Sequence, residues 1–448
     1  MTTVRRDNGP MKFLPAIIVA SALTVAGCSS ENGSGLPPQV GTSACSIDGQ
    51  KQFVLDKMRD VYFWYELLPA TVDLAAYPTP EALLEYLVSF QPVDNFSFIN
   101  LAETDAQFFG AGQYEGFGFS TRFEAADDLR FTRVFGSSPA NGAGFARGQQ
   151  ILMLNGRTIA DIEANEGVGS LFSLPALEFT IRQLDGTEFT TTVNKDIVTI
   201  DPIPQHRVID RPDGTSVGYF ELVTFISTAD DQLLTVFGDF QAAGVTDLIV
   251  DMRYNGGGLV NTAELLGDYL GGAVADNTVF SRTLFNDLNS ASNRIEFFQR
   301  EVESLILSRL VVIATGQTAS ASELVTNSMF PHVDVSIVGG TTLGKPVGQL
   351  GIPFCDKILR PTSFETVNSD NDGQYFDGLQ VDCAAADLLN VPIGDDADPN
   401  IVAALSVLDT GACPAQAAGQ VNQQKPEDMH MLNARRGGPP WQQLTDAW

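Results

Sequence analysis

The sequence predicts a multidomain α/β protein, and three observations carry that prediction. A chain of 448 residues has room for about two to four domains with sizeable cores. From Gly218 onward, apolar runs typical of buried strands alternate with helical patterns, which indicates α/β layering. Upstream of that region, residues 45–106 have helical patterns, whereas Leu177–Arg182 alternates like a half-buried strand.

The first residues have the pattern of an export signal. Basic residues precede an apolar run over residues 13–26, which is too short and wrongly flanked for a stable transmembrane helix. The run ends in Leu23-Thr24-Val25-Ala26-Gly27-Cys28, which resembles the lipobox of bacterial lipoproteins and implies lipidation of Cys28. We therefore expect a signal peptide over 1–27 and a flexible tether over 28–44. The alternatives are a signal peptide without lipid and a buried helix.

Residues 45–106 are expected to form a small helical domain. Thr79-Pro80-Glu81 is a good helix start, with a capping residue, a proline at the first position and an acid in the first turn. An apolar helix face is formed by Val54, Met58, Val61, Tyr62, Leu67 and Leu68. The aromatic run Tyr62–Tyr65 is expected to pack in the core rather than grip a ligand.

Two strand–loop segments carry the chemistry of the third region, which we place over residues 201–413. The strand Val311–Ala314 is followed by a break and then by a helix over 320–330, so that Ser320 lies at a helix N-terminus. The N–H of Ala321 is then a natural donor to an oxyanion. The strand Leu248–Val250 leads into a glycine-rich loop, in which the backbone can approach a ligand closely.

A serine nucleophile in this chain has to be activated by something other than histidine. There are only three histidines, and none lies in a setting that suggests a base. A lysine can serve instead if burial keeps it neutral. Lys345 follows Ser320 by 25 residues, and Gln349 lies 4 further on, where a neutral amide can orient an amine without stabilising its charge. We interpret Ser320 and Lys345 as a catalytic dyad oriented by Gln349. The alternative is a Ser/Ala-rich turn with an exposed lysine.

The run Thr318-Ala319-Ser320-Ala321-Ser322-Glu323, with Gly344-Lys345 and Gln349, resembles the carboxyl-terminal processing (tail-specific) serine peptidases. The resemblance covers residues 50 to 412 and implies a serine endopeptidase that cleaves proteins or peptides near their C-termini. It also implies a ClpP/crotonase-like fold for the catalytic domain, and the roles of nucleophile, base and orienter for Ser320, Lys345 and Gln349.

Asp251–Gly258 resembles the oxyanion segment of the same family, and Gly257 matches the glycine that donates its N–H there. Gly256 stands where relatives often have proline, so the donor can be displaced by one residue. The alternative is a flexible loop without a catalytic role.

Residues 107–200 resemble a PDZ domain, through Gly116-Phe117-Gly118-Phe119 and the segments Ser137–Gly148 and Ile151–Gly156. In such domains the first of these segments receives a peptide carboxylate on its backbone N–H groups, while the peptide adds as a strand. We therefore predict peptide binding at Gly116, Phe117, Gly118 and Phe119. The alternative is that the domain is structural or gates the active site.

The net charge and the cysteines indicate which partners and which kind of compartment to expect. A net charge of −29 argues against nucleic acid as a partner. With Cys28 lipidated, four cysteines remain for disulfides; three pairings are possible, and Cys355–Cys383 is the first choice. Metal-type spacing is absent, and we expect neither a metal nor a cofactor. The tail over 414–448 is expected to be disordered.

The combined prediction is an exported, lipid-anchored peptidase of the cell envelope, facing the periplasm, with the outer membrane as the first choice. Its partners are the C-terminal segments of proteins or peptides, and the membrane through the lipid. Two other classes remain open. One is an inactive peptide-binding scaffold, against which the intact Ser320, Lys345 and Gln349 argue. The other is acyl-CoA chemistry, against which the export signal and the PDZ-like region argue.

Overall fold

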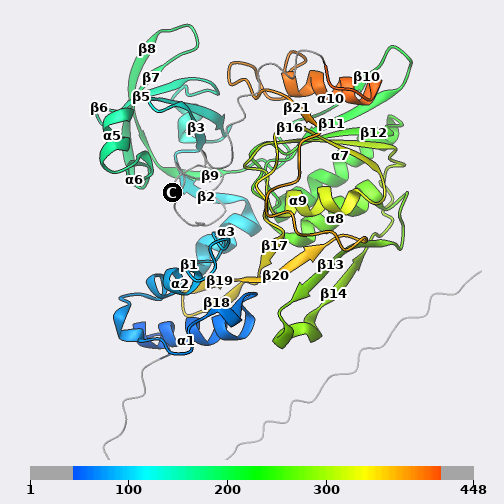
Figure 1. Ribbon diagram of the computed structural model, residues 1–448. Helices are drawn as coiled ribbons and strands as arrows, with labels where there is room; N and C mark the ends of the chain where they lie inside the picture. Colours follow the sequence, from blue (N-terminus) through cyan, green and yellow to red (C-terminus); the bar gives the residue numbers. More distant parts are fainter. Residues whose placement is uncertain (1–43, 415–448) are drawn as a thin grey trace, which may run out of the picture. The chain divides into compact units, whose positions relative to one another are not determined.

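The computed structural model describes residues 44–414, which lie within a single compact unit. The predicted signal peptide, the lipidation site Cys28 and nearly all of the predicted tether and tail lie outside this range. Secondary structure is mixed α/β and is distributed over several sheets (Figure 1). No helix among the described residues is long and apolar enough to cross a membrane.

The N-terminal module consists of helices and one strand. The cap of α2 is the predicted one, because the Thr79 side chain accepts a hydrogen bond from the Ala82 N–H and Pro80 is the first helical residue. Helix α1 buries Val54 and Met58 as expected but ends at Val61, and Leu67 is exposed in a short 3-10 turn. The elements are α1 Ile47–Val61, η1 Tyr65–Leu67, η2 Leu74–Ala76, α2 Pro80–Val88, β1 Phe98–Leu101 and α3 Ala102–Ala111.

Strand β1 joins the N-terminal module to residues 352–360. It pairs antiparallel with β19, with Phe98 opposite Arg360, in a three-stranded sheet of order β1-β19-β18. The partner strands are β18 Ile352–Phe354 and β19 Lys357–Arg360. A helical region was expected here, so β1 and its distant partners are an addition to the predicted architecture.

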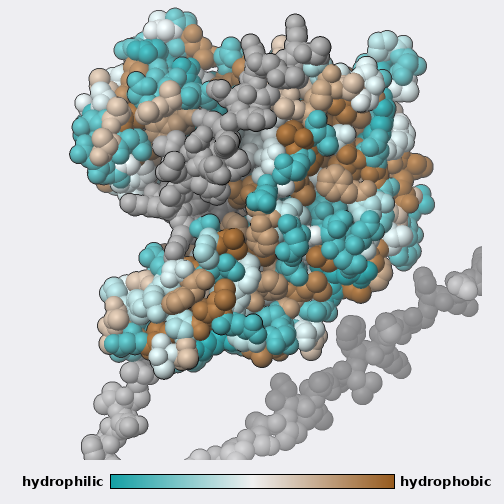
Figure 2. Space-filling view, in the orientation of Figure 1, coloured by the Kyte–Doolittle hydropathy of each residue, from teal (hydrophilic) through white to brown (hydrophobic). Residues whose placement is uncertain are grey.

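The second module is a six-stranded antiparallel sheet, of order β3-β4-β5-β7-β8 with the short β6 paired to β5, around an aromatic core that includes Phe119, Phe131 and Phe179. Its visible surface over β7, β8 and α5 is mostly hydrophilic (Figure 2), which agrees with the exposed, polar outer residues of β8. The elements are β3 Phe119–Ala125, β4 Asp128–Val134, α4 Pro139–Gly142, β5 Gln150–Leu154, β6 Arg157–Thr158, α5 Ile159–Asn165, α6 Val168–Phe172, β7 Ala176–Arg182 and β8 Glu188–Asn194. It is flanked by the antiparallel pair β2 Gln113–Gly116 and β9 Asp196–Thr199.

The third module is built on a six-stranded central sheet of order β10-β11-β12-β15-β16-β21. The strands from β11 to β21 are parallel, and β10 adds antiparallel at the edge. Successive residues of β12 alternate between two cores: Leu248 and Val250 belong to one, and Ile249 to the other. Both faces of the sheet are therefore buried, as the continuous apolar runs predicted.

Helices α7, α8 and α9 contribute to the core on one face of the central sheet, and α10 to the core on the other. The elements are β10 His206–Asp210, β11 Ser216–Glu221, η3 Ser227–Ala229, α7 Asp230–Ala242, β12 Asp247–Asp251, α8 Val260–Gly271, β15 Arg309–Ala314, α9 Ala321–Met329, β16 Asp334–Gly339, β21 Cys383–Ala384 and α10 Pro399–Thr410. A second, antiparallel sheet of order β14-β13-β20-β17 is formed by β13 Val279–Phe285, β14 Arg294–Phe297, β17 Val347–Gln349 and β20 Thr362–Val367. The short 3-10 helix η4 Asp287–Ser292 connects β13 to β14.

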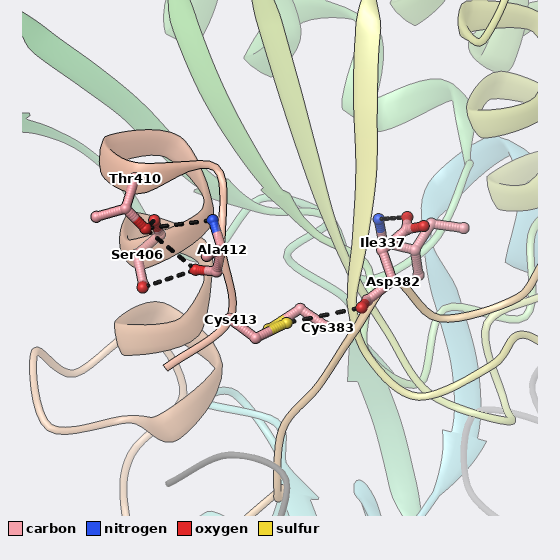
Figure 3. The surroundings of a disulfide bond; sticks show 7 residues. All are labelled: Ile337, Asp382, Cys383, Ser406, Thr410, Ala412 and Cys413. Carbon is pink, nitrogen blue, oxygen red and sulfur yellow. Dashed lines mark hydrogen bonds between the residues drawn. A yellow bond between two sulfur atoms is a disulfide. The ribbon is translucent and has the colours of Figure 1, made fainter. Parts of the chain in front are cut away.

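The disulfide pairing differs from the predicted one. Cys45 pairs with Cys355, and Cys383 pairs with Cys413, so the expected Cys355–Cys383 bridge is wrong. The first bridge connects the start of the N-terminal module to the β18–β19 turn, which β1 brings close. The second ties the segment after α10 to β21 of the central sheet (Figure 3).

Candidate active site

Three neighbouring parallel strands end at one edge of the central sheet, and each delivers one predicted residue. Strand β12 ends before the loop that contains Gly257, β15 ends before Ser320, and β16 ends before the loop that contains Lys345. Because carboxyl ends of parallel strands meet at a common edge, residues far apart in the sequence converge there. The topology alone therefore brings the predicted nucleophile, base and oxyanion loop to one place.

Ser320 stands at the sharp turn from β15 into α9. Its φ of 57° and ψ of −113° are unusual for a residue with a side chain and cost roughly 1–3 kcal/mol. The first residue of the helix is Ala321, whose N–H is one of the helix-start donors without an intrahelical partner. The serine is half-buried at the positive end of the α9 dipole, where developing negative charge is favoured.

Glu323, on the first turn of α9, bridges the segments of Ser320 and Lys345. One carboxylate oxygen accepts hydrogen bonds from the backbone N–H of Ser320 at 2.9 Å and of Lys345 at 2.8 Å. The other accepts from the Gly344 N–H at 2.7 Å and from the Thr342 hydroxyl at 2.5 Å. Burial raises the pKa of Glu323, and these four donors oppose the shift. Sequence reasoning gave this glutamate no role, although it belongs to the quoted run.

The Lys345 side chain is buried. Burial lowers its pKa to about 8, against the opposing influence of the carboxylates of Asp94 and Glu323. Its Nζ donates to Gln349 Oε1 at 2.9 Å and lies 4.8 Å from the centre of the Phe96 ring. A lysine with this pKa is neutral in about a tenth of the molecules at pH 7, far more than an ordinary lysine, which suits a general base.

Gln349 is held so that its oxygen faces the lysine. Its amide nitrogen donates to the backbone carbonyls of Phe96 and Arg360, the latter at 3.3 Å. With the amide nitrogen facing two acceptors, the amide oxygen is left to accept from Lys345. The structure thus brings Lys345 and Gln349 together as the sequence predicted.

Ser320 and Lys345 are tied through backbone, but their side chains are not hydrogen-bonded in this conformation. Within residues 44–414, Lys345 Nζ donates to Gln349, and no hydrogen bond joins it to the Ser320 hydroxyl. The loop of Gly257 is pressed against the serine: a Cβ on Gly257 would lie 2.8 Å from the Ser320 Cβ and 2.8 Å from the Ala321 nitrogen. The Gly257 N–H itself donates to Asn255 Oδ1 at 2.9 Å. Its role as an oxyanion donor stays a prediction that requires this bond to be exchanged.

A buried charge cluster supports the Gly257 loop and contacts the second module. Arg253 is fully enclosed and pairs with Asp251, Asp387 and Asp398. Asp387 also pairs with Arg122 and Arg147 of the second module and accepts a hydrogen bond from the Tyr254 hydroxyl. The guanidinium groups hold the pKa of Asp387 well below its usual range in spite of its burial. This cluster was not predicted from the sequence.

The predicted peptide-binding loop lies at the start of β3. The rings of Phe117 and Phe119 pack in the core of the second module, so only the backbone of this loop can meet a ligand. Gly118 has a φ of 87°, and a Cβ there would lie 2.0 Å from the Ser138 Cβ. Next to the loop, Lys195 Nζ lies 5.5 Å from the centre of the Phe117 ring.

A cavity of about 520 Å³ opens beside this loop, between α4 and the end of β8. Lys195 lines it, but none of residues 116–119 does. Over residues 44–414 no group of three or more metal-ligating side chains is found.

Comparison with known proteins finds matches to one peptidase family in two segments of the chain. Residues 216–383 match peptidase family S41, and residues 49–98 match the peptidase S41 N-terminal domain. The carboxy-terminal processing protease CtpA of Bacillus subtilis is 23% identical over 302 residues, which cover 64% of this chain and 59% of that protein. The carboxyl-terminal-processing protease of Picosynechococcus is 25% identical, over 53% of this chain and 56% of that protein. The chain thus spans less than two thirds of the length of these curated relatives.

Solved structures show the same fold. A putative S41 protease from Bacteroides fragilis superposes with a TM-score of 0.65 at 24% identity, covering 80% of this chain and 97% of that one. The photosystem II D1 C-terminal processing protease gives a TM-score of 0.50 at 19% identity, covering 75% and 92%.

Proposed function

We propose that the chain is a serine endopeptidase of family S41 that uses a Ser320–Lys345 dyad, since residues 216–383 and 49–98 match the models of that family. The observation that carries the proposal is the buried Lys345 amine with a pKa of about 8, anchored to the Ser320 segment through Glu323. In this assignment Ser320 is the nucleophile, Lys345 the general base, and Gln349 the orienter of the amine.

The reaction follows from these positions. Neutral Lys345 takes the proton of the Ser320 hydroxyl while Oγ attacks the peptide carbonyl, and the Ala321 N–H donates to the oxyanion that forms. The lysine ammonium then protonates the leaving amine as the peptide bond breaks, which leaves an acyl-serine. A water molecule, deprotonated by Lys345, attacks the acyl group; as the acyl–Oγ bond breaks, the Lys345 ammonium returns the proton to Ser320 Oγ and the new carboxyl terminus is released. In the first step the Ser320 hydroxyl has to donate to the lone pair of the Lys345 amine, whose N–H keeps its bond to Gln349; the serine–lysine bond is not made in this conformation, and catalytic hydrogen bonds often tighten only with substrate present.

Variants of the dyad test this function directly. Ser320→Ala and Lys345→Ala should each abolish hydrolysis of a flexible peptide without unfolding the protein, and the double variant should be no worse than either. The rate of the wild type should rise with pH through about pH 8, because Lys345 deprotonates there. Lys357→Ala, in the same module, is the matched control and should leave the rate unchanged. Full activity in Lys345→Ala would exclude lysine as the base.

The second module is proposed to be PDZ-like and to direct cleavage toward C-terminal ends. The backbone of Gly116–Phe119 and the neighbouring Lys195 offer N–H groups and a positive charge for a carboxylate. Cleavage of a peptide with a free carboxylate should then exceed that of its amidated twin. Gly118→Trp should erase the difference, because any side chain there collides with Ser138. Equal rates for both peptides in the wild type would leave this module a structural role only.

The proposed location is the cell envelope, with the protein exported and anchored through lipid on Cys28, facing the periplasm. The two disulfides support export, since such bridges persist in oxidising compartments. Cys28→Ser should move the full-length protein from the membrane fraction to the soluble fraction. A variant that stays with washed membranes would refute the lipid anchor.

The ClpP/crotonase-like classification of the third module rests on the parallel central sheet with helices on both faces.

A further inference from the structure

The segment between α2 and β1 brings the N-terminal module to the base. Phe96 on this segment makes two contacts with the Lys345–Gln349 pair. Its ring centre lies 4.8 Å from Lys345 Nζ, and its carbonyl accepts a hydrogen bond from the Gln349 amide. We propose that Phe96 is a positioning residue that excludes water from the Lys345 amine and fixes the amide that orients it. This inference rests on the proposed function and adds the N-terminal module to the active site.

The carbonyl of Phe96 determines which way Gln349 faces. A glutamine amide can turn over so that its oxygen and nitrogen exchange places. Here a reversed amide would present its oxygen to the Phe96 and Arg360 carbonyls, so that three acceptors would face one another without a donor. It would also present its NH₂ group to Lys345. The two carbonyls therefore keep the amide oxygen on the amine, and one of them comes from the N-terminal module.

A buried carboxylate fixes the segment that carries Phe96. Asp94, which is 2% exposed, accepts hydrogen bonds from the backbone N–H groups of Phe96 and Ser97, both at 3.1 Å. It also accepts from the Ser97 hydroxyl at 2.6 Å and the Thr362 hydroxyl at 3.0 Å. The Ser97 hydroxyl in turn accepts from the Thr362 N–H at 2.9 Å. The segment is thus fastened to the start of β20, and Phe96 is not a freely moving surface residue.

The ring of Phe96 acts on the Lys345 amine in two opposing ways. Its π face attracts the ammonium by about 0.5–2 kcal/mol, which favours the charged form. Its bulk excludes water, which favours the neutral form, and loss of water shifts the pKa of a buried lysine by up to several units. The other groups that act on the amine are the Asp94 and Glu323 carboxylates, which raise its pKa, and the Arg360 guanidinium, which lowers it. Burial is the largest influence on the pKa of Lys345, and we infer that the ring acts mainly through its share of that burial.

Two variants test this role by removing the shield in different ways. Phe96→Ala opens space for water beside the amine, and Phe96→Gln keeps a side chain there but supplies a polar amide. Both should raise the pKa of Lys345 by about one unit, which lowers the neutral fraction at pH 7 about tenfold. Phe96→Leu, which stays apolar, should keep the pKa within about half a unit of the wild type. Phe90→Ala removes an exposed ring from the same module and is the control for a general effect of truncation.

The measurement should read the lysine directly as well as the reaction. Competitive acetylation of the intact protein by acetic anhydride over a pH series, with mass spectrometry of the peptide that contains Lys345, gives the pKa of its amine. The pH profile of kcat/KM for a flexible peptide reports the pKa of the same amine through the reaction. In Phe96→Ala and Phe96→Gln the rising limb should move to higher pH, and the rate should recover at alkaline pH. A structural defect would instead lower the rate at every pH.

The two readouts separate this inference from the proposed function. If the wild type does not cleave peptides, the proposed function fails, while acetylation still reports whether Phe96 controls the Lys345 amine. If the circular dichroism spectrum or the elution volume shows that Phe96→Ala does not fold, Phe96→Gln decides the question. An unchanged pKa of Lys345 in the folded variants would overturn the role of Phe96. An upward shift of equal size in Phe96→Leu would overturn the exclusion of water as its cause.

Discussion

Replacing Glu323 by glutamine tests whether one carboxylate sets the geometry of the whole site. Its two oxygens each accept two hydrogen bonds, from Ser320 and Lys345 on one side and from Thr342 and Gly344 on the other. Glutamine offers a single oxygen, so one pair of donors loses its acceptor and faces an NH₂ group. Hydrogen bonds to a charged group contribute about 1.5–3 kcal/mol each, so about 3–6 kcal/mol of interaction is lost. Removing a buried charge offsets part of this loss.

We expect Glu323→Gln to lower the free energy of unfolding by about 2–4 kcal/mol and kcat/KM by about 10²- to 10³-fold. The pH profile should shift as well. The Glu323 carboxylate raises the pKa of Lys345, so its neutralisation lowers that pKa from about 8 and moves the rising limb of the rate toward lower pH. A lower kcat/KM combined with a rising limb at lower pH is a result that loss of folding alone does not produce.

The assay pairs urea unfolding with kcat/KM measured from pH 5 to 10. Glu365→Gln is the matched control, since Glu365 lies on β20 and its carboxylate accepts from Gln374 rather than from the site. It should leave both the rate and the profile unchanged. If Glu323→Gln kept the wild-type rate, the bridge between the Ser320 and Lys345 segments would not position the dyad. A limb displaced to higher pH would refute the electrostatic reasoning.

Three further predictions concern the supports of the site. Asp387→Ala leaves Arg122, Arg147 and Arg253 without their shared partner, so the free energy of unfolding should fall by about 3–5 kcal/mol in urea titrations. Because the folded-state pKa of Asp387 is depressed, its contribution is present above about pH 4 and is lost as the pH falls, and the variant should lack that acid dependence. Replacing both Cys45 and Cys355 by serine should cost roughly 2–5 kcal/mol and lower Tm, while the rate at 25 °C is retained; an unchanged Tm would contradict this. Gly257→Ala should lower kcat far more than it raises KM, because the added Cβ meets Ser320 and Ala321; an unaltered kcat would show that the loop lies elsewhere during the reaction.

The sequence was most informative where a local pattern is sufficient. The predicted strand at Val311–Ala314 and the helix after Ser320 match β15 and α9 to within about two residues, because an apolar run and a helix start are both local signals. The Thr79 cap is another such case. Once the strands are parallel, the convergence of their carboxyl ends follows from topology and needs no further information.

The features that were missed depend on pairing between distant segments. Strand β1 is four residues long, and its partner β19 lies far later in the sequence, so no local pattern predicts the pairing. The same pairing brings Cys45 beside Cys355, and no local pattern in the sequence distinguishes this bridge from the Cys355–Cys383 bridge that was the first choice. Glu323 follows Ser320 by three residues, as a capping glutamate does, yet its second pair of donors comes from the loop after β16. The role of Phe96 likewise exists only after the N-terminal module has packed against β20.

Two hydrogen bonds at the site have the same kind of acceptor, and only the one made by Gly257 has to be exchanged during the reaction. Lys345 Nζ and the Gly257 N–H both donate to neutral side-chain amides, of Gln349 and Asn255. An oxyanion is a stronger acceptor than an amide oxygen, so a reacting substrate competes well for the Gly257 N–H. Asn255 is held through its own nitrogen by the Leu222 carbonyl at 2.8 Å, so the glycine peptide, rather than the asparagine, has to turn. Gly257 and Gly258 have φ values of 100° and 142°, a range that glycine adopts without steric cost. The Gly257 N–H belongs to the peptide between Gly256 and Gly257, which can turn between two glycines, while the Gly257 carbonyl stays held by the Phe225 N–H and the Thr224 hydroxyl, both at 3.0 Å.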